Sequence, residues 1–169
     1  MGYTTDFRGE FEISPPLQEK HRDYLNAFAY IRHMGRDVGK LKDMPDPKRI
    51  AVNMPLGKEG EYYVGSSDDQ QYGQFNDGTI LDHNQQASTQ PGLWCQWVPT
   101  EDGTALVWDE GEKFYNYIEW LEYIIENFMK PWGYTLNGEV LWQGEGFSDI
   151  GKIKVNDNNV KTSEPRWDD

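Results

Sequence analysis

The stretch FYNYIEWLEYIIENFMKPWGYTLNGEVLW, from Phe114 to Trp142, decides the fold. At about 100° per residue, its apolar side chains gather on one half of a helical cylinder. These are Phe114, Tyr117, Ile118, Trp120, Leu121, Ile124, Ile125, Phe128 and Met129. Because burying one large side chain is worth about 1.5–3 kcal/mol, we expect this face to dominate the core. We predict a helix that is capped by Asp109 and ends at Pro131, followed by a strand over 134–143.

The opposite half of this predicted helix is polar and acidic, and we predict that it is exposed. Its candidate partner-binding residues are Glu112, Tyr115, Glu119, Glu122, Tyr123 and Glu126. The glutamates belong to a longer run, 101–126, which holds eight acids and one base. Such a run indicates either a solvated face or a functional acidic surface, and the sequence leaves both open.

Alternating and β-rich segments flank this helix. Residues 3–13 place Thr5, Phe7, Phe11 and Ile13 on one side and charged residues on the other, which is typical of a half-buried antiparallel strand. A helix opens after Ser14-Pro15-Pro16 and ends near Gly35 or Gly39. Further strands are predicted at 93–98, 104–108, 151–155 and 160–162. The order β-α-long loop-β-β-α-β-β predicts an α+β fold, with a mainly antiparallel sheet and two helices packed on one side.

A chain of 169 residues is normally one domain. Residues 43–92 are rich in Pro, Gly, Asn, Gln and Asp and lack periodicity, so we predict a long irregular insertion there. We therefore predict a single domain over 1–162 and a frayed C-terminal tail over 163–169. The sequence sets no oligomeric state.

Charge and composition exclude several classes of protein. The chain has 29 acids and 16 bases, a formal charge of −13, which repels phosphate backbones and argues against direct nucleic-acid binding. No run approaches the about 18 apolar residues that a membrane span needs, and the N-terminus has no signal-peptide pattern. Cys95 is the single cysteine, so disulfides are not expected. We predict a cytoplasmic protein that does not bind membranes.

No pattern predicts catalysis or metal binding. His21, His33 and His83 lie far apart in sequence, without metal-ligand spacing, and Cys95 stands between bulky residues in a predicted strand. The paired carboxylates are the remaining enzymatic option, because Glu139 or Glu145 with Asp149 could act as the acid and base of a glycosidase. We predict no catalytic residue, no metal and no cofactor.

A basic segment offers an alternative to protein binding. Residues 32–49 are rich in Arg and Lys, and the loop that follows is rich in aromatic side chains. The candidate ligand-binding residues are Arg32, His33, Arg36, Tyr62, Tyr63, Tyr72 and Phe75. Cations and stacked rings together suit a nucleotide or another phosphate ligand. Neutralisation of a neighbouring acidic surface explains the same cations without any ligand.

Four segments of the sequence are similar to segments of a known protein family. GYTTDF-x-G-x-F, PGLWCQWVP, EKFYNYIEWLEY and WGY-x-LNGEV-x-W-x-GE are similar to an uncharacterised family of small acidic proteins of bacteriophage and bacterial genomes. That family has no established activity, so the resemblance transfers no catalytic residue. It implies a non-enzymatic, phage-associated protein-binding factor that inhibits a host defence or nucleic-acid-handling protein. The expected partner is a host or bacterial protein with a basic groove.

Overall fold

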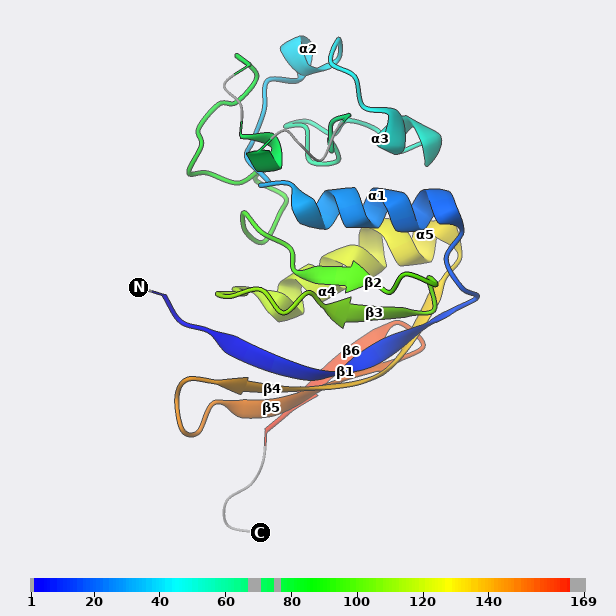
Figure 1. Cartoon of the computed structure of the whole chain (residues 1–169), viewed down its shortest axis with the longest axis vertical. Helices are drawn as coiled ribbons and strands as arrows, with labels where there is room; N and C mark the ends of the chain where they lie inside the picture. The colour runs from blue at the N-terminus through cyan, green and yellow to red at the C-terminus, as the bar shows by residue number, and fades with distance from the viewer. Residues whose placement is uncertain (1, 67–70, 75–76, 165–169) are drawn as a thin grey trace. The chain divides into compact units, whose positions relative to one another are not determined.

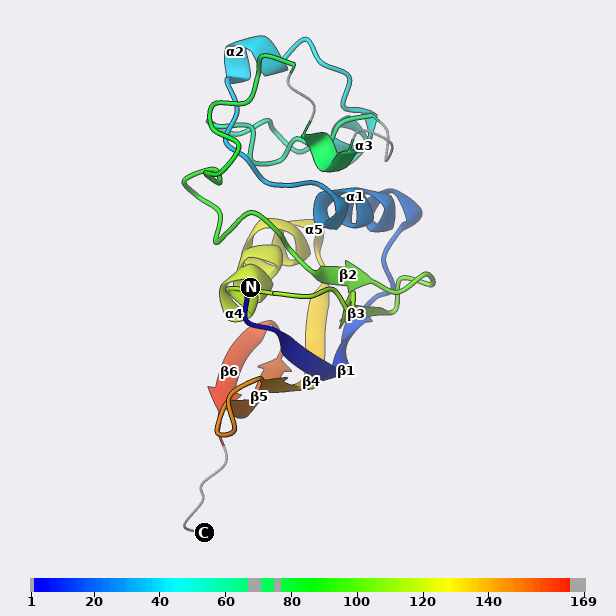
Figure 2. The ribbon, with the colours of Figure 1, turned by 60° about the vertical axis from the view of Figure 1, so that its left-hand side comes forward.

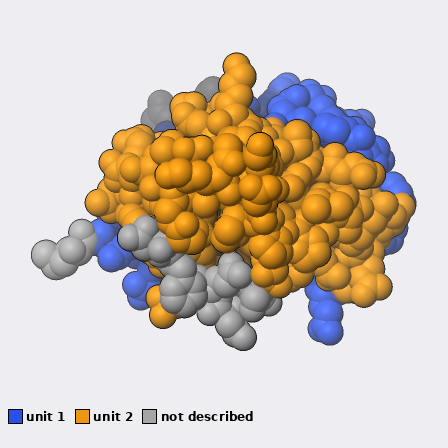
Figure 3. All heavy atoms as spheres, turned by 90° about the horizontal axis from the view of Figure 1, so that it is seen from above, with its two compact units in different colours: residues 1–17, 96–169 blue, residues 18–95 orange. Residues whose placement is uncertain are grey.

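The computed structural model describes residues 2–66, 71–74 and 77–164. Its contacts divide the chain into two compact units, one formed by 1–17 with 96–169 and the other by 18–95 (Figure 3). The first unit contains the whole sheet, and the second contains the predicted insertion. Five of the seven residues of the predicted tail lie outside the described part of the chain. The predicted domain limits stay a prediction.

The first unit is built on a six-stranded sheet in the order β2-β3-β1-β4-β5-β6, with every neighbouring pair antiparallel (Figure 1). Its strands are β1 (Thr5–Ser14), β2 (Trp97–Pro99), β3 (Ala105–Trp108), β4 (Thr135–Gly144), β5 (Ile150–Asn156) and β6 (Asn159–Ser163). The predicted α+β class with a mainly antiparallel sheet is confirmed. The predicted hairpin between the second and third strands is also present, in the register Trp97↔Trp108.

The two longest strands, β1 and β4, form the centre of the sheet. They pair over their full lengths, and Phe7, Phe11 and other alternate residues of β1 are buried as predicted. Gly9 has φ 114° and Gly138 has φ 147°, which non-glycine residues rarely adopt. A Cβ on Gly9 would overlap the backbone oxygen of Glu139. The two glycines therefore let these strands approach each other closely.

One long helical segment covers a face of this curled sheet (Figure 2). It consists of α4 (Tyr117–Ile124), a π-helical stretch η2 (Ile125–Met129) and α5 (Lys130–Trp132). The indole Nε1 of Trp97 donates a hydrogen bond to Tyr117 O (2.9 Å), which fixes the start of the helix to β2. The predicted core residues Trp120, Leu121, Ile124 and Phe128 are all buried.

Both predicted ends of this helix are wrong. The Asp109 carboxylate accepts a hydrogen bond from Gly111 N (2.8 Å) and shapes a turn, and the helix begins only at Tyr117. Pro131 lies inside the helix rather than after it. The wide π turn precedes it, and Gly133, with φ 87°, ends the helix in the left-handed conformation.

The second unit consists of helices and long connections. Its helices are α1 (Glu19–Tyr30), α2 (Val38–Leu41), α3 (Pro47–Ala51) and the 3-10 helix η1 (Gln71–Gly73). The helix α1 ends at Tyr30, before the predicted Gly35 or Gly39, because Ile31 is already extended and packs against Leu41 and Tyr63. No helix of the described residues has the length and apolar character required to cross a membrane.

Candidate functional site

The predicted acidic face of the helix is present on α4 and η2. Glu119, Glu122 and Glu126 are exposed and follow the i, i+3, i+7 spacing of one helical stripe. Glu112 and Tyr115 precede the helix and are also exposed. The structure thus places five of the six predicted partner-binding residues at the surface.

The sixth, Tyr123, is a correction. Only 8% of it is exposed, because its ring packs edge-on against Trp120 (centroids 5.4 Å apart) and Phe128 (6.0 Å). Residues three positions apart adjoin on a helix, so Trp120 draws Tyr123 into the core. The apolar face is therefore wider than half of the cylinder, and Tyr123 is not available as an anchor.

The two glutamates at the C-terminal end of the stripe face lysines. Glu122 and Glu126 line a groove of about 620 Å³ with Lys130, Lys154 and Lys161. Lys130 Nζ lies 2.5 Å from Glu126 Oε1, and Lys154 and Lys161 are direct cross-strand neighbours on β5 and β6. Cations therefore offset the acidic charge at this end of the stripe.

At the opposite end of the stripe, a hydrogen-bond network joins Tyr115 to the β4–β5 turn. Tyr3 N donates to the Tyr115 hydroxyl (3.0 Å), and the Tyr3 hydroxyl donates to Asp149 Oδ2 (2.6 Å). The other carboxylate oxygen of Asp149 accepts from Trp142 Nε1 (3.0 Å). Tyr3 also accepts a hydrogen bond from Gly146 N (2.8 Å). These contacts fix two exposed tyrosine rings next to a carboxylate.

Several acids lie close to this network. The pKa of Tyr117 is raised to about 12, first by burial and then by the charges of Asp149, Glu119 and other neighbours. The hydrogen bond to Asp149 raises the pKa of Tyr3. We use the name acidic–aromatic surface for Tyr3, Tyr115, Glu119, Glu145 and Asp149. The Tyr3 hydroxyl therefore stays protonated at neutral pH.

Of the residues of this surface, the sequence predicted only Tyr115 and Glu119 as binding residues. Tyr3 begins the first predicted strand, and Glu145 and Asp149 follow the fourth, so no local pattern links them. The antiparallel pairing of Thr5 with Gly144 brings the two segments together. The sequence does mark a tight turn here, through the glycines of 144–146 and Asp149. It does not show which residues from elsewhere in the chain contact that turn.

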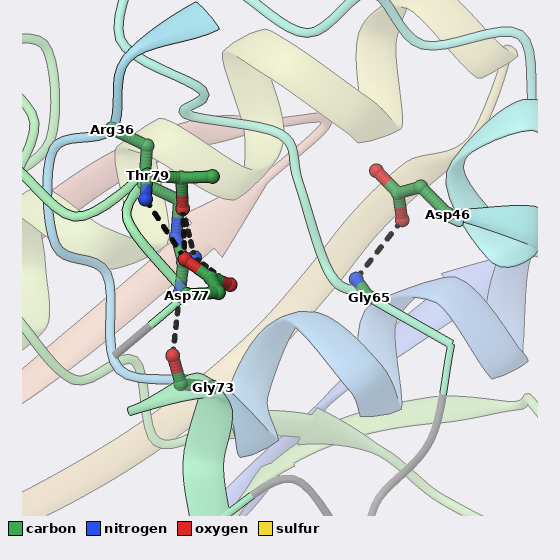
Figure 4. Close-up of polar contacts among 6 residues, drawn as sticks. All are labelled: Arg36, Asp46, Gly65, Gly73, Asp77 and Thr79. Atoms are coloured by element: carbon green, nitrogen blue, oxygen red, sulfur yellow. Dashed lines mark hydrogen bonds and ion pairs between the residues drawn. The ribbon is translucent and has the colours of Figure 1, made fainter. Parts of the chain in front are cut away.

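Arg36, one of the predicted ligand-binding residues in the second unit, has a structural role (Figure 4). It is 2% exposed, and its guanidinium donates to Gly73 O (2.5 Å) and Thr79 Oγ1 (2.9 Å). It also forms an ion pair with Asp77 (3.6 Å) and lies 4.8 Å from the ring centroid of Tyr63. These contacts join the segment that precedes the predicted insertion to the later part of the insertion, so the Arg36 guanidinium is used within the fold.

A second buried charge in this unit is also structural. The carboxylate of Asp46 pairs with Arg49 Nε (2.5 Å) and accepts hydrogen bonds from Val64 N (3.2 Å) and Gly65 N (3.0 Å; Figure 4). Burial raises the pKa of Asp46, and the hydrogen bond from Arg49 opposes that shift. Arg49, a member of the predicted basic segment, thus pairs with a buried acid inside this unit rather than with a ligand.

Two more of the predicted ligand residues, His33 and Tyr63, are also buried. His33 is buried, its Nε2 donates to Phe28 O (2.8 Å), and burial lowers its pKa to about 4, so it is neutral at pH 7. Tyr63 is buried beside Arg36, and Tyr62 O accepts from the Tyr24 hydroxyl (2.8 Å). Phe75 lies outside the described residues.

Arg32 and Tyr72 do lie together, with two aromatic residues that the sequence did not single out. The Tyr72 ring is 48% exposed and packs against Tyr30 (4.9 Å) and Trp94 (5.6 Å). The Arg32 guanidinium lies 5.7 Å from the ring centroid of Trp94, and Arg32 N donates to Tyr72 O (2.8 Å). Tyr30 also lines a cavity of about 350 Å³ with Lys48.

No family model, curated protein or solved structure matches this chain. The resemblance to a phage-associated family therefore stays a prediction. Within the described residues, no group of three or more His, Cys, Asp or Glu side chains is placed to hold a metal ion. Two candidate sites therefore remain: the acidic–aromatic surface, and the Tyr72 cluster, by which we mean Tyr72, Tyr30, Trp94 and Arg32.

Proposed function

We propose that the protein is a non-enzymatic, protein-binding factor that uses the acidic–aromatic surface together with the exposed glutamates Glu112 and Glu122 of the same acidic run. The observation that carries this proposal is Tyr115, which is half exposed and accepts a hydrogen bond from the backbone of Tyr3, while the Tyr3 hydroxyl binds Asp149. Tyrosine is enriched among residues that dominate binding energy, and a ring that is already fixed loses little entropy on association. The same side chains on a mobile loop would bind more weakly.

The acidic charge suggests what kind of partner fits. A chain of charge −13 associates fastest with a positively charged surface, and electrostatic steering raises association rates by about 10–1,000-fold. Proteins that handle nucleic acids carry such surfaces in their binding grooves. Together with the sequence resemblance, this supports a phage accessory protein that inhibits a host defence or nucleic-acid-handling protein by occupying a basic groove.

Charge reversal tests the proposal. We expect the triple variant Glu112→Lys, Glu119→Lys and Glu122→Lys to keep its fold, because all three side chains are exposed. We expect its association rate with the partner to fall at least about tenfold at low salt, since the steering charge is reversed. Partners are captured from bacterial lysate on the unaltered protein, and association is then measured by surface plasmon resonance at two salt concentrations.

The matched control is Asp6→Lys, Glu10→Lys and Glu12→Lys, which changes the net charge equally. These three residues are exposed on β1, where they alternate with the buried Phe7 and Phe11. The proposal expects this control to keep most of the association rate. Equal rates for the two triple variants, or a lysate that yields no partner of the unaltered protein, would overturn it.

A second candidate function is binding of a nucleotide or another phosphate ligand. The Tyr72 cluster supports it, because a half-exposed ring beside Trp94 and Arg32 suits the stacking of a base. Tyr72 itself has φ 62°, a conformation that costs non-glycine residues energy and that often occurs at functional sites. The burial of Arg36 and His33 limits the site to a smaller set of residues than the sequence suggested.

Thermal unfolding in the presence of nucleotides tests this second candidate. A nucleotide at a hundred times its dissociation constant adds about 2.7 kcal/mol to the free energy of unfolding, so the midpoint should rise by several degrees. We expect Tyr72→Ala to abolish that rise, and Tyr115→Ala, in the other unit, to keep it. If mononucleotides, cyclic dinucleotides and inorganic phosphate all leave the midpoint unchanged, this function is excluded.

A further inference from the structure

Phe147 is the most exposed large apolar side chain of the described residues, with 88% of its surface accessible. It lies in the turn between β4 and β5, two residues before Asp149. An exposed phenylalanine leaves apolar area in water that burial would stabilise. Single exposed apolar residues are common, however, so exposure alone does not define a site. The turn that carries Phe147 supplies the second observation.

This turn is held in one conformation by hydrogen bonds on both sides of Phe147. Gly144 N donates to Asp149 O (2.8 Å), Asp149 N donates to Gly146 O (3.0 Å), and Gly146 N donates to the Tyr3 hydroxyl (2.8 Å). A Cβ on Gly144 would overlap both the Asp149 carboxylate and the Tyr3 hydroxyl. The backbone thus closes tightly around Tyr3, a residue more than 140 positions away in the chain.

Carboxylates surround the base of the turn. Glu145 Oε2 accepts a hydrogen bond from Thr4 N, and Asp149 accepts from Tyr3 and from Trp142. Both acids precede or follow Phe147 by two residues. The turn therefore combines an exposed apolar ring with two carboxylates that hydrogen bonds hold in place. A partner that accepts this ring must therefore offer an apolar pocket with cationic side chains at its rim.

We infer that Phe147 is the anchor residue of the interaction, and that it inserts into an apolar pocket bordered by Lys or Arg on the partner protein. This inference rests on the proposed protein-binding function and adds the anchor and the chemistry of its receptor. The ordered turn explains how one ring can contribute strongly, because the conformational entropy of the loop is lost on folding rather than on binding. Tyr3 connects the anchor to Tyr115, so both rings meet the same partner.

The first experiment compares Phe147→Ala with Phe147→Tyr, a variant that keeps the aromatic ring. We expect Phe147→Ala to weaken binding of the captured partner at least about 30-fold, as truncation of an anchor does, and Phe147→Tyr to retain most of the affinity. Thermal unfolding of both variants should match that of the unaltered protein, because the side chain makes little contribution to the core. Equal affinities of Phe147→Ala and the unaltered protein would overturn the inference.

The second experiment places the photo-crosslinking residue p-benzoylphenylalanine at position 147, with position 81 of the other unit as the control. Leu81 is 63% exposed, so both sites are accessible. Crosslinks from position 147 to a peptide of the partner that combines apolar residues with Lys or Arg would support the inference. Crosslinks to a second copy of this chain, or binding to phosphatidylcholine–phosphatidylglycerol vesicles that Phe147→Ala abolishes, would overturn it.

The two proposals can fail separately. If charge reversal at Glu112, Glu119 and Glu122 slows association and Phe147→Ala binds normally, the acidic–aromatic surface binds the partner without this anchor. If charge reversal has no effect, the proposed function itself fails, whatever Phe147 does. Equal loss of binding by the control variant at Asp6, Glu10 and Glu12 would indicate a non-specific charge effect and would count against both.

Discussion

Replacement of Arg36 by methionine is expected to lower the free energy of unfolding by about 3–5 kcal/mol, the typical cost of removing one partner of a buried charge network. The guanidinium is 2% exposed and binds Gly73 O, Thr79 Oγ1 and Asp77. Methionine fills much of the same volume but donates no hydrogen bond. Gly73 O would then lose a charge-assisted partner, and Asp77 would lose its neutralising charge.

Urea unfolding, followed by circular dichroism, measures this loss, and hydrogen exchange shows where it falls. We expect faster exchange of amides in 31–95, because Arg36 connects distant parts of that unit. Lys40→Met is the matched control, since Lys40 is exposed and its loss should change stability by less than about 0.5 kcal/mol. Arg36→Lys keeps the charge but not the planar fork, so it should recover only part of the loss. Equal stabilities of Arg36→Met and Lys40→Met would mean that Arg36 is not a structural centre.

Periodicity predicted the sheet well because the relevant information is local. The buried residues of β1 alternate with exposed ones except at Gly9, where β1 and β4 approach each other closely. The core face of the long helix was equally readable, since Leu121 and Phe128 lie on one side of a 3.6-residue period. In each case one face meets the core and the other meets solvent, and the sequence records that difference directly.

The ends of the helix and the roles of the candidate site residues could not be predicted from local sequence in the same way. Asp109 has the chemistry of an N-cap, but its carboxylate shapes a turn with Gly111 instead. Arg36 has the chemistry of a ligand residue, but its guanidinium donates to Thr79 and Gly73, about forty residues away. Such outcomes depend on contacts between distant segments, which local propensity does not encode.

The acidic–aromatic surface illustrates the same limit. Tyr3 and Asp149 are 146 positions apart, and their hydrogen bond follows from the pairing of β1 with β4. The sequence predicted an antiparallel sheet but not the register of its strands. The residues that meet at the ends of β1 and β4 could therefore not be named. A predicted register that placed Thr5 opposite Gly144 would have brought Tyr3 to the turn.

The second large effect is expected at Leu121. Leu121→Ala should lower the free energy of unfolding by about 2–5 kcal/mol, because the side chain is fully buried and its removal leaves a cavity. The adjacent Glu122 is exposed at the mouth of the groove, so Glu122→Ala should cost less than about 0.5 kcal/mol. Two neighbouring residues of one helix should thus differ several-fold in their contribution to stability.

Leu121→Met is the control that separates the cavity from the mere change of side chain. Methionine preserves most of the volume, so this variant should cost less than about 1.5 kcal/mol. Chemical denaturation of the three variants under one set of conditions gives the comparison, provided that the denaturant dependence of the free energy stays constant. Because Leu121 lies one helical turn after Tyr117, whose ring packs on Phe7 and Trp142, its burial fixes the phase of the helix over the sheet. Similar losses for Leu121→Ala and Glu122→Ala would mean that another face of the helix meets the core, and that Glu119 and Tyr115 point elsewhere.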